Sequence, residues 1–123
     1  MVKISVDEGY AFDILSIFQV KIHNCTDPIK IETSKRGFSV LYEELKAQLG
    51  QEKLSEIINS SEYDELYTEN QTTFVLVDAI RASDENSIGK DIDLNNLRRF
   101  ECKRKLHNKF FDSQMLETKT KYE

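Results

Sequence analysis

The chain has 123 residues, and its 22 acidic against 17 basic side chains give a formal net charge of −5 at neutral pH. This length suits one domain, so we expect residues 1–123 to form a single helical-bundle domain with 112–123 as a flexible tail. The negative charge argues against nucleic acid as a partner. No apolar stretch is long enough to span a membrane and no signal peptide is evident, so we expect a cytoplasmic protein without a membrane partner.

The cysteines and the turn-forming residues narrow the class of protein further. Cys25 and Cys102 belong to no CxxC pair or Cys/His cluster, so the sequence predicts neither a zinc site nor a disulfide framework, and we expect no metal and no cofactor. Both cysteines are expected to be reduced and structural. One proline and four glycines leave few turn signals, which favours long helices over short strands.

The first predicted helix begins after Asp7, whose carboxylate can cap free amides, and ends near Asn24. Its apolar side chains cover more than half of its circumference, which predicts a central helix with several neighbours. The second helix opens at Asp27 and Pro28, a cap followed by proline at the first helical position, and stops at Gly50.

Residues 51–59 are predicted to form a short helix or an irregular connection. Ser60 or Ser61 can then cap a third long helix that ends near Ala82, with a capping box from Ser61 to Asp64. The polar stretch 83–91 is the longest predicted loop, and the last helix is expected from about Ile92 to Phe111. The predicted fold class is therefore all-α, an antiparallel bundle of four main helices, with or without one short extra helix at 51–59.

Polar and charged side chains interrupt the apolar stripes of three of these helices. The helical spacing places them inward, although a buried charge is costly unless it is paired or binds a ligand. They are Asp13, Lys21, Asn70, Arg81, Arg99, Lys103 and Arg104.

Two interpretations of these inward groups remain open. In the first, Asp13 or Asp78 pairs with the cations in a closed network that fixes the helix register. In the second, the groups line a pocket for a small phosphate or carboxylate, with the two aspartates as weak candidates for a catalytic base. The ligand-binding candidates are Lys21, Asn70, Arg81, Asn96, Arg99 and Lys103.

Charge is distributed unevenly between the last two long helices. Residues 98–109 carry six basic side chains and one acid, whereas the third helix is acidic until Arg81. The simpler interpretation is that the two helices lie side by side, and the alternative is a phosphate-binding face. Glu62, Glu65 and Glu69 share one helical face but lack the matching Glu-x-x-His of a bundle metal site.

Several short motifs resemble a family of small bacterial and phage-type proteins that is known only as a domain of unknown function. Its first helix is near G-E-x-x-D-K-L-T-I-L-E-I-K, followed by D-P-x-K, and its later helices contain N-x-x-L-W-x-I-E-D-x-I-R and N-D-x-R-A-x-L-K. The resemblance covers most of the chain, and it implies a helical fold and no assigned activity. The matching residues are Gly9, Asp13, Leu15, Ser16, Ile17, Lys21, Asp27, Pro28, Lys30, Asn70, Asp78, Ile80, Arg81, Asn96, Arg99, Lys103 and Leu106.

Motifs of the common enzyme classes are absent from the sequence, which has no P-loop, GxGxxG, GxSxG or HExxH. We therefore expect a non-enzymatic accessory or protein-interaction protein that binds a protein partner or self-associates, with the apolar face of the first helix as one candidate surface. The alternative is a binder of, or an enzyme acting on, a small anionic metabolite in an interhelical Arg/Lys pocket.

Overall fold

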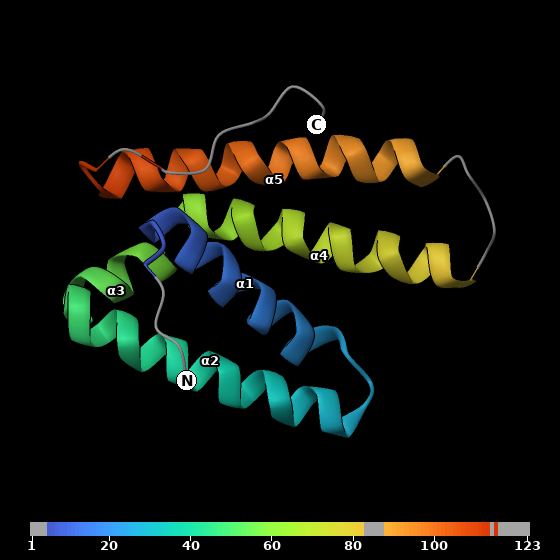
Figure 1. The fold of residues 1–123 in the computed structure, drawn as a ribbon, viewed down its shortest axis with the longest axis horizontal. Helices are drawn as coiled ribbons and strands as arrows, with labels where there is room; N and C mark the ends of the chain where they lie inside the picture. Colours follow the sequence, from blue (N-terminus) through green and yellow to red (C-terminus); the bar gives the residue numbers. More distant parts are fainter. Residues whose placement is uncertain (1–4, 83–87, 114, 116–123) are drawn as a thin grey trace.

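The computed structural model describes residues 5–82, 88–113 and 115, with the backbone alone at 80–82 and 88–90. In that part of the chain the structure consists of five helices and no strand (Figure 1). The helices α1 and α2 form one antiparallel hairpin, α4 and α5 form another, and the short α3 joins them. The predicted fold class is confirmed. The helices are α1 (Glu8–Asn24), α2 (Pro28–Leu49), α3 (Gln51–Ile58), α4 (Ser61–Ala82) and α5 (Ile88–Phe110).

The first two helices begin and end where local chemistry predicts. The Asp7 carboxylate accepts the N–H of Tyr10 at 2.8 Å, and the Asp27 carboxylate accepts the N–H of Ile29 at 2.9 Å. Both side chains satisfy donors that a helix start leaves unpaired. Gly50 ends α2 with a φ of +86°, a conformation that glycine adopts without a Cβ penalty.

One predicted capping contact, at α4, and one predicted boundary, at α5, differ from the structure. Ser60, rather than Ser61, caps α4, because its Oγ accepts the N–H of Tyr63 at 3.2 Å while the Ser61 hydroxyl bonds to its neighbour Glu62. The capping box is therefore not formed. The α5 helix begins at Ile88, four residues earlier than predicted, with Asp91 in its first turn. A helix start tolerates polar residues there, and residues 83–87 lie outside the described part of the chain.

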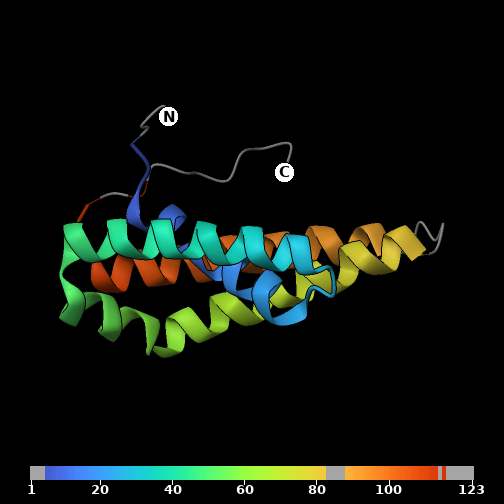
Figure 2. The same ribbon diagram turned by 90° about the horizontal axis from the view of Figure 1, so that it is seen from below.

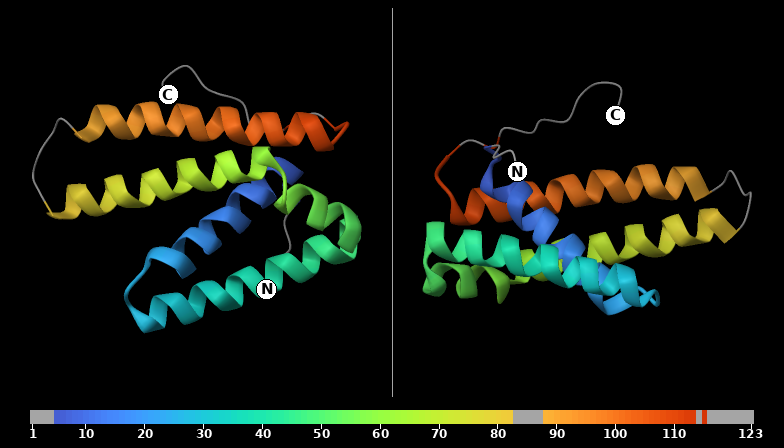
Figure 3. Two further views of the ribbon diagram at one scale, coloured as in Figure 1. Left: turned by 180° about the vertical axis from the view of Figure 1, so that it is seen from behind. Right: turned by 60° about the horizontal axis from the view of Figure 1, so that its bottom comes forward.

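Helix α1 is central, as its broad apolar face predicts, and packs against α2, α4 and α5 (Figures 2 and 3). Phe12 and Leu15 on α1 are completely buried, together with Leu54, Leu66 and Leu106 from three other helices. Much of this apolar face is therefore covered within one chain, although Tyr10 is 40% exposed.

The oppositely charged helices α4 and α5 lie side by side, joined by a row of ion pairs. Lys109 Nζ lies 2.7 Å from Glu62, Arg98 Nε lies 3.2 Å from Glu69, and Lys105 completes the row with Glu65. These contacts confirm the simpler interpretation of the charge asymmetry. They also occupy the acids that were considered for a metal site, and the described residues contain no cluster of metal-ligating side chains.

The α4–α5 hairpin extends beyond the corner where α1 turns into α2 (Figures 1 and 3). The second half of α4 therefore continues past the α1–α2 corner, and none of its side chains at 71–79 is fully buried. None of the described helices is long and apolar enough to cross a membrane.

Candidate functional site

The inward polar groups form a network around Asp13, which is 7% exposed on α1. The Asn70 Nδ2 donates to the Asp13 carboxylate at 2.9 Å and to the Ser16 hydroxyl at 2.5 Å. The Ser16 hydroxyl in turn donates to the backbone carbonyl of Asp13 at 2.8 Å. One buried carboxylate thus ties α4 to α1.

Two cations of α5 approach the same carboxylate. Arg99 Nη2 lies 3.7 Å and Lys103 Nζ lies 3.9 Å from Asp13 Oδ2. Lys103 is 6% exposed and its ammonium also lies 5.6 Å from the centre of the Tyr10 ring. These contacts support the predicted register network, since Asp13 links α1 to both α4 and α5.

A second buried amide fixes α5 against α4. Asn95 is completely buried, and its Nδ2 donates to the backbone carbonyl of Glu69 at 3.1 Å and to its carboxylate at 2.8 Å. Its Oδ1 accepts the Thr73 hydroxyl. We predicted a role for the next residue, Asn96, which is instead exposed and accepts from Arg99 at 3.3 Å. The sequence contains one sign that Asn95 is buried. It lies four residues before Arg99, so the two residues share the inward face of the helix.

The start of α1 is held by His107, which is completely buried. The backbone N–H of Gly9 donates to its Nδ1 at 3.1 Å, so the ring proton lies on Nε2, 2.7 Å from the carbonyl of Ser113. Glu8 lies beside the ring and accepts the Ser113 hydroxyl at 3.2 Å. The first described residues after α5 therefore pack back onto α1.

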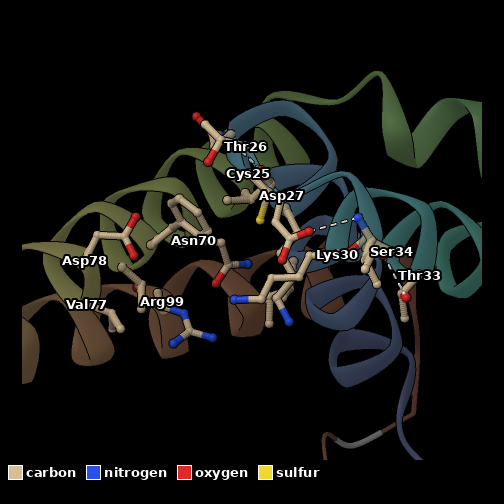
Figure 4. Close-up of a pocket in the computed structure, with 17 residues that line it drawn as sticks. Cys25, Thr26, Asp27, Lys30, Thr33, Ser34, Asn70, Val77, Asp78 and Arg99 are labelled. Atoms are coloured by element: carbon tan, nitrogen blue, oxygen red, sulfur yellow. Dashed lines mark hydrogen bonds between the residues drawn. The ribbon is translucent and has the colours of Figure 1, made fainter. Parts of the chain in front are cut away.

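A cleft of about 710 Å³ opens at the other end of α1, between the α1–α2 corner and the second half of α4 (Figure 4). Its volume is within the range of small-molecule sites. Side chains of α1, α2, α4 and the loop between α1 and α2 form its walls, and Arg99 reaches it from α5. The apolar part of the lining comprises Ile17, Val20, Ile29, Phe74 and Val77.

The polar lining contains three cations and two carboxylates. They are Lys21, Lys30 and Arg99, and Asp27 and Asp78; all of them except Lys21 are labelled in Figure 4. Neither lysine has an ion-pair partner among the described residues, whereas the Asp27 carboxylate already caps α2. The cleft therefore offers two unpaired ammonium groups and a guanidinium that has only long contacts.

Within the described part of the chain, two buried polar atoms of the lining residues have no hydrogen-bond partner, namely Asn70 Oδ1 and Arg99 Nε. The amide orientation of Asn70 is fixed because its Nδ2 donates to the Asp13 carboxylate, which a carbonyl oxygen could not do. A buried acceptor or donor left without a partner costs about 1–3 kcal/mol. Both atoms belong to residues that the network and the cleft lining share, and neither atom is exposed to solvent.

The structure brings together only some of the predicted site residues. Lys21, Asn70 and Arg99 line the cleft, but Lys21 is exposed and not buried in the α1 stripe, because α2 and α4 diverge beside the last turns of α1. Lys103 lies in the network and not in the cleft. The predicted inward position of Arg104 is wrong, since it is exposed, and the Arg81 side chain lies outside the described part of the structure.

The two weak catalytic candidates occupy different environments. Asp13 is held by an amide and two cations, whereas Asp78 is exposed on the cleft wall. The lining residues Cys25, Lys30 and Asp27 were not in our predicted site, although the sequence places them at the α1–α2 corner. Their helix assignments alone did not indicate that this corner faces a cleft.

Burial shifts the pKa of two groups outside the cleft. Burial raises the pKa of the Tyr63 hydroxyl, which donates to Gln19 on α1. Burial also raises the pKa of the Cys102 thiol, and the carboxylates of Glu69 and Glu65 add to the effect. Both groups therefore stay protonated at neutral pH.

No family model, curated protein or solved structure matches this chain. The resemblance to the domain of unknown function stays a prediction.

Proposed function

We propose that the cleft binds a small anionic molecule with an apolar body, and that Arg99, Lys21 and Lys30 hold its phosphate or carboxylate group. The observation that carries this proposal is that Arg99 has few and long polar contacts. Its Nε is buried without a partner, and its contacts to Asp13 and Asn96 are 3.7 and 3.3 Å long. Charge-assisted hydrogen bonds are normally about 2.7–2.9 Å, so Arg99 is weakly held.

The network tolerates a change of partner at Arg99. If the guanidinium turns toward an anion in the cleft, Asp13 keeps the Asn70 amide at 2.9 Å and the Lys103 ammonium at 3.9 Å. No buried carboxylate is then left alone, which would be the costly outcome. The register network and the binding site are therefore compatible, with Arg99 and Asn70 as the residues that they share.

The walls of the cleft favour a ligand that is only partly polar. Phe74 and Val77 on α4 and Ile17 and Val20 on α1 line the cleft together with the cations. Small-molecule sites typically combine such apolar walls with a few polar groups that fix orientation. Asp78 at the rim disfavours a second negative charge on that side, so a monoanion fits better than a polyanion.

The proposal is tested by calorimetric titration with hexanoate and hexyl phosphate, which carry an anion on an apolar chain, and with hexanol, which lacks the charge. We expect both anions to bind at least about tenfold more tightly than hexanol, because hydrogen bonds to charged groups contribute about 1.5–3 kcal/mol. Equal affinities for hexanol and hexanoate would overturn the proposal.

Matched variants locate the site. Arg99→Gln should weaken hexanoate binding at least about tenfold. The control is Arg98→Gln, which changes the neighbouring arginine, whose partner is Glu69 and which does not line the cleft. Similar losses in both variants would place the anion elsewhere.

A protein partner or self-association stays a prediction. The exposed large apolar side chains are distributed over several helices, including Ile29 on α2, Val75 on α4 and Leu94 on α5. Light scattering during size-exclusion chromatography tests this expectation directly.

A further inference from the structure

His107 is a buried titratable side chain that the proposed function does not use. It lies at the start of α1, is completely buried, and has both ring nitrogens engaged. Nδ1 accepts the backbone N–H of Gly9 at 3.1 Å, and Nε2 donates to the backbone carbonyl of Ser113 at 2.7 Å. One neutral ring therefore joins α1 to the segment after α5, which comprises residues 111–113 and 115 of the described chain.

The hydrogen bond from Gly9 requires a neutral ring. Histidine normally changes its charge between pH 5 and 8, and its charged form carries a proton on both nitrogens. A proton from solvent on Nδ1 places two donors opposite each other, with 3.1 Å between the nitrogens. The amide is fixed in the first turn of α1, where Asp7 accepts the N–H groups of Tyr10 and Ala11. The positive end of the helix dipole also disfavours a cation there, so the charged ring has to move.

A partner for the charged ring lies next to it. Glu8 Oε2 is 3.8 Å from Nδ1, and the Glu8 side chain is 36% exposed, so solvent reaches the carboxylate beside the ring. The same oxygen accepts the Ser113 hydroxyl at 3.2 Å. Pairing of this carboxylate with the charged ring competes with that bond, and rotation of the ring breaks the bond from Nε2 to the Ser113 carbonyl. Both of these hydrogen bonds of Ser113 therefore depend on the neutral ring.

We infer that His107 is a pH-sensitive latch, in which protonation of Nδ1 releases the segment after α5 from the start of α1. Apolar contacts of the segment are coupled to the same ring, because the Phe111 ring lies 5.6 Å from that of His107 and 6.2 Å from that of Phe12. The docked state needs the neutral ring and the released state does not. Docking is therefore complete above the pH at which the ring takes up a proton, and is lost below it.

The other charged side chains near the ring have contacts of their own. Lys103, one turn earlier on α5, lies on the other side of Gly9 and approaches Asp13. Lys53 of α3 lies over the Phe111 ring, with its Nζ 4.9 Å from the ring centre. The Glu8 carboxylate is therefore the group that we expect to pair with the charged ring. The remaining charged groups are the α1 cap Asp7 and the exposed Arg104 and Asp112.

The test follows the segment by NMR as the pH of the full-length protein is lowered from about 8 to about 5.5. Methionine occurs only at positions 1 and 115, so labelling of methionine methyl groups gives one signal for the segment. Met115 is 9% exposed, and its methyl signal should shift to the position of a solvent-exposed methionine. This shift should have the same midpoint as the shifts of the His107 ring nitrogens and of the Gly9 amide.

Matched variants assign the transition to one ring. His107→Gln should abolish the shift of Met115. His23→Gln changes the other histidine of the chain, whose Nδ1 lies 2.8 Å from the Tyr67 hydroxyl, and should leave the shift unchanged. Glu8→Gln tests the latch with the buried ring in place. It keeps an acceptor for the Ser113 hydroxyl but removes the charge that stabilises the protonated ring, so the midpoint should move to lower pH.

Four results would overturn the inference. They are protonation of His107 without a shift of Met115, a ring that stays neutral down to about pH 5.5, a transition that persists in His107→Gln, and an unchanged midpoint in Glu8→Gln. Each of them leaves the proposed function intact, because the latch lies at the start of α1 and the cleft at its end.

Discussion

The two ends of α1 hold polar groups in opposite states. From its start to its middle, the buried groups around His107 and Asp13 have partners from α4, α5 and the segment after α5. Toward its end, Lys21 has no ion-pair partner among the described residues, and the neighbouring Asn70 and Arg99 each keep one buried atom unsatisfied there. Polar and charged side chains therefore stabilise the bundle from the start to the middle of α1. Similar side chains near the end of α1, where the helices diverge, remain available to a ligand.

The largest effect is expected when the closed region loses its carboxylate. Asp13→Leu leaves the Lys103 ammonium and the Asn70 amide buried without their common partner. Breaking one side of a buried ion pair costs about 3–5 kcal/mol, so the free energy of unfolding should fall by that amount in urea denaturation.

The matched change in the open region is Asp78→Leu, at an exposed residue of the cleft wall. It should alter the free energy of unfolding by less than about 0.5 kcal/mol. Equal losses of unfolding free energy in Asp13→Leu and Asp78→Leu would contradict the claim that polar groups are paired around Asp13 and available to a ligand at the cleft.

Asn95 is expected to give the next largest effect. Asn95→Ala removes the donor to the Glu69 carbonyl and carboxylate, and the Thr73 hydroxyl keeps only the Glu69 carbonyl as its acceptor. The expected loss is about 1–3 kcal/mol of unfolding free energy by the same measurement. Asn96→Ala, at the exposed neighbour, serves as the control, and a larger loss there than at Asn95 would contradict the assignment of the inward face.

Gly9 tests the packing at the start of α1, where the sign of the effect is informative. A Cβ there would lie 3.1 Å from the Cβ of His107 and 3.3 Å from its Nδ1. Glycine to alanine in a helix normally stabilises by up to about 1 kcal/mol, but overpacking costs about 1–3 kcal/mol. Thermal denaturation should therefore show that Gly9→Ala is less stable than the parent protein, and an increase in stability would disprove the close contact.

The smallest effect is expected for the exposed row of ion pairs between α4 and α5. The hydrogen bond from Lys109 holds the pKa of Glu62 below its usual value of 4.5. A lowered pKa in the folded state adds stability above that usual value, and this contribution is lost as the pH falls through the folded pKa. In Lys109→Gln the NMR titration midpoint of Glu62 should rise, and an unchanged midpoint would mean that the ion pair is absent in solution.

The sequence allowed the helix limits to be predicted well because caps act locally. Asp7, Asp27 and Gly50 each act on groups within one turn, so no tertiary information is needed to interpret them. The inward positions of Asp13, Asn70 and Lys103 followed from helical spacing, because each lies on the stripe that meets a neighbouring helix.

The exposure of Lys21, the burial of Asn95 and the cleft could not be predicted from the sequence, because they depend on where the neighbouring helices lie. Helical spacing gave the direction of Lys21 but not the divergence of α2 and α4 that leaves it exposed. A rotation of about 100° per residue separates Asn95 from Asn96, so the contact line between α4 and α5 decided which of the two is buried. The cleft itself arises from the placement of two hairpins, which no single helix pattern specifies.

The most direct test of the central claim is the NMR signal of the Arg99 Nε–H during titration with hexanoate. The account predicts a shift of this signal that saturates with the cleft amides of α1 and α4, while the Arg98 Nε–H, paired with Glu69, stays in place. A saturating titration in which the Arg99 signal does not move, or moves no more than that of Arg98, would contradict it.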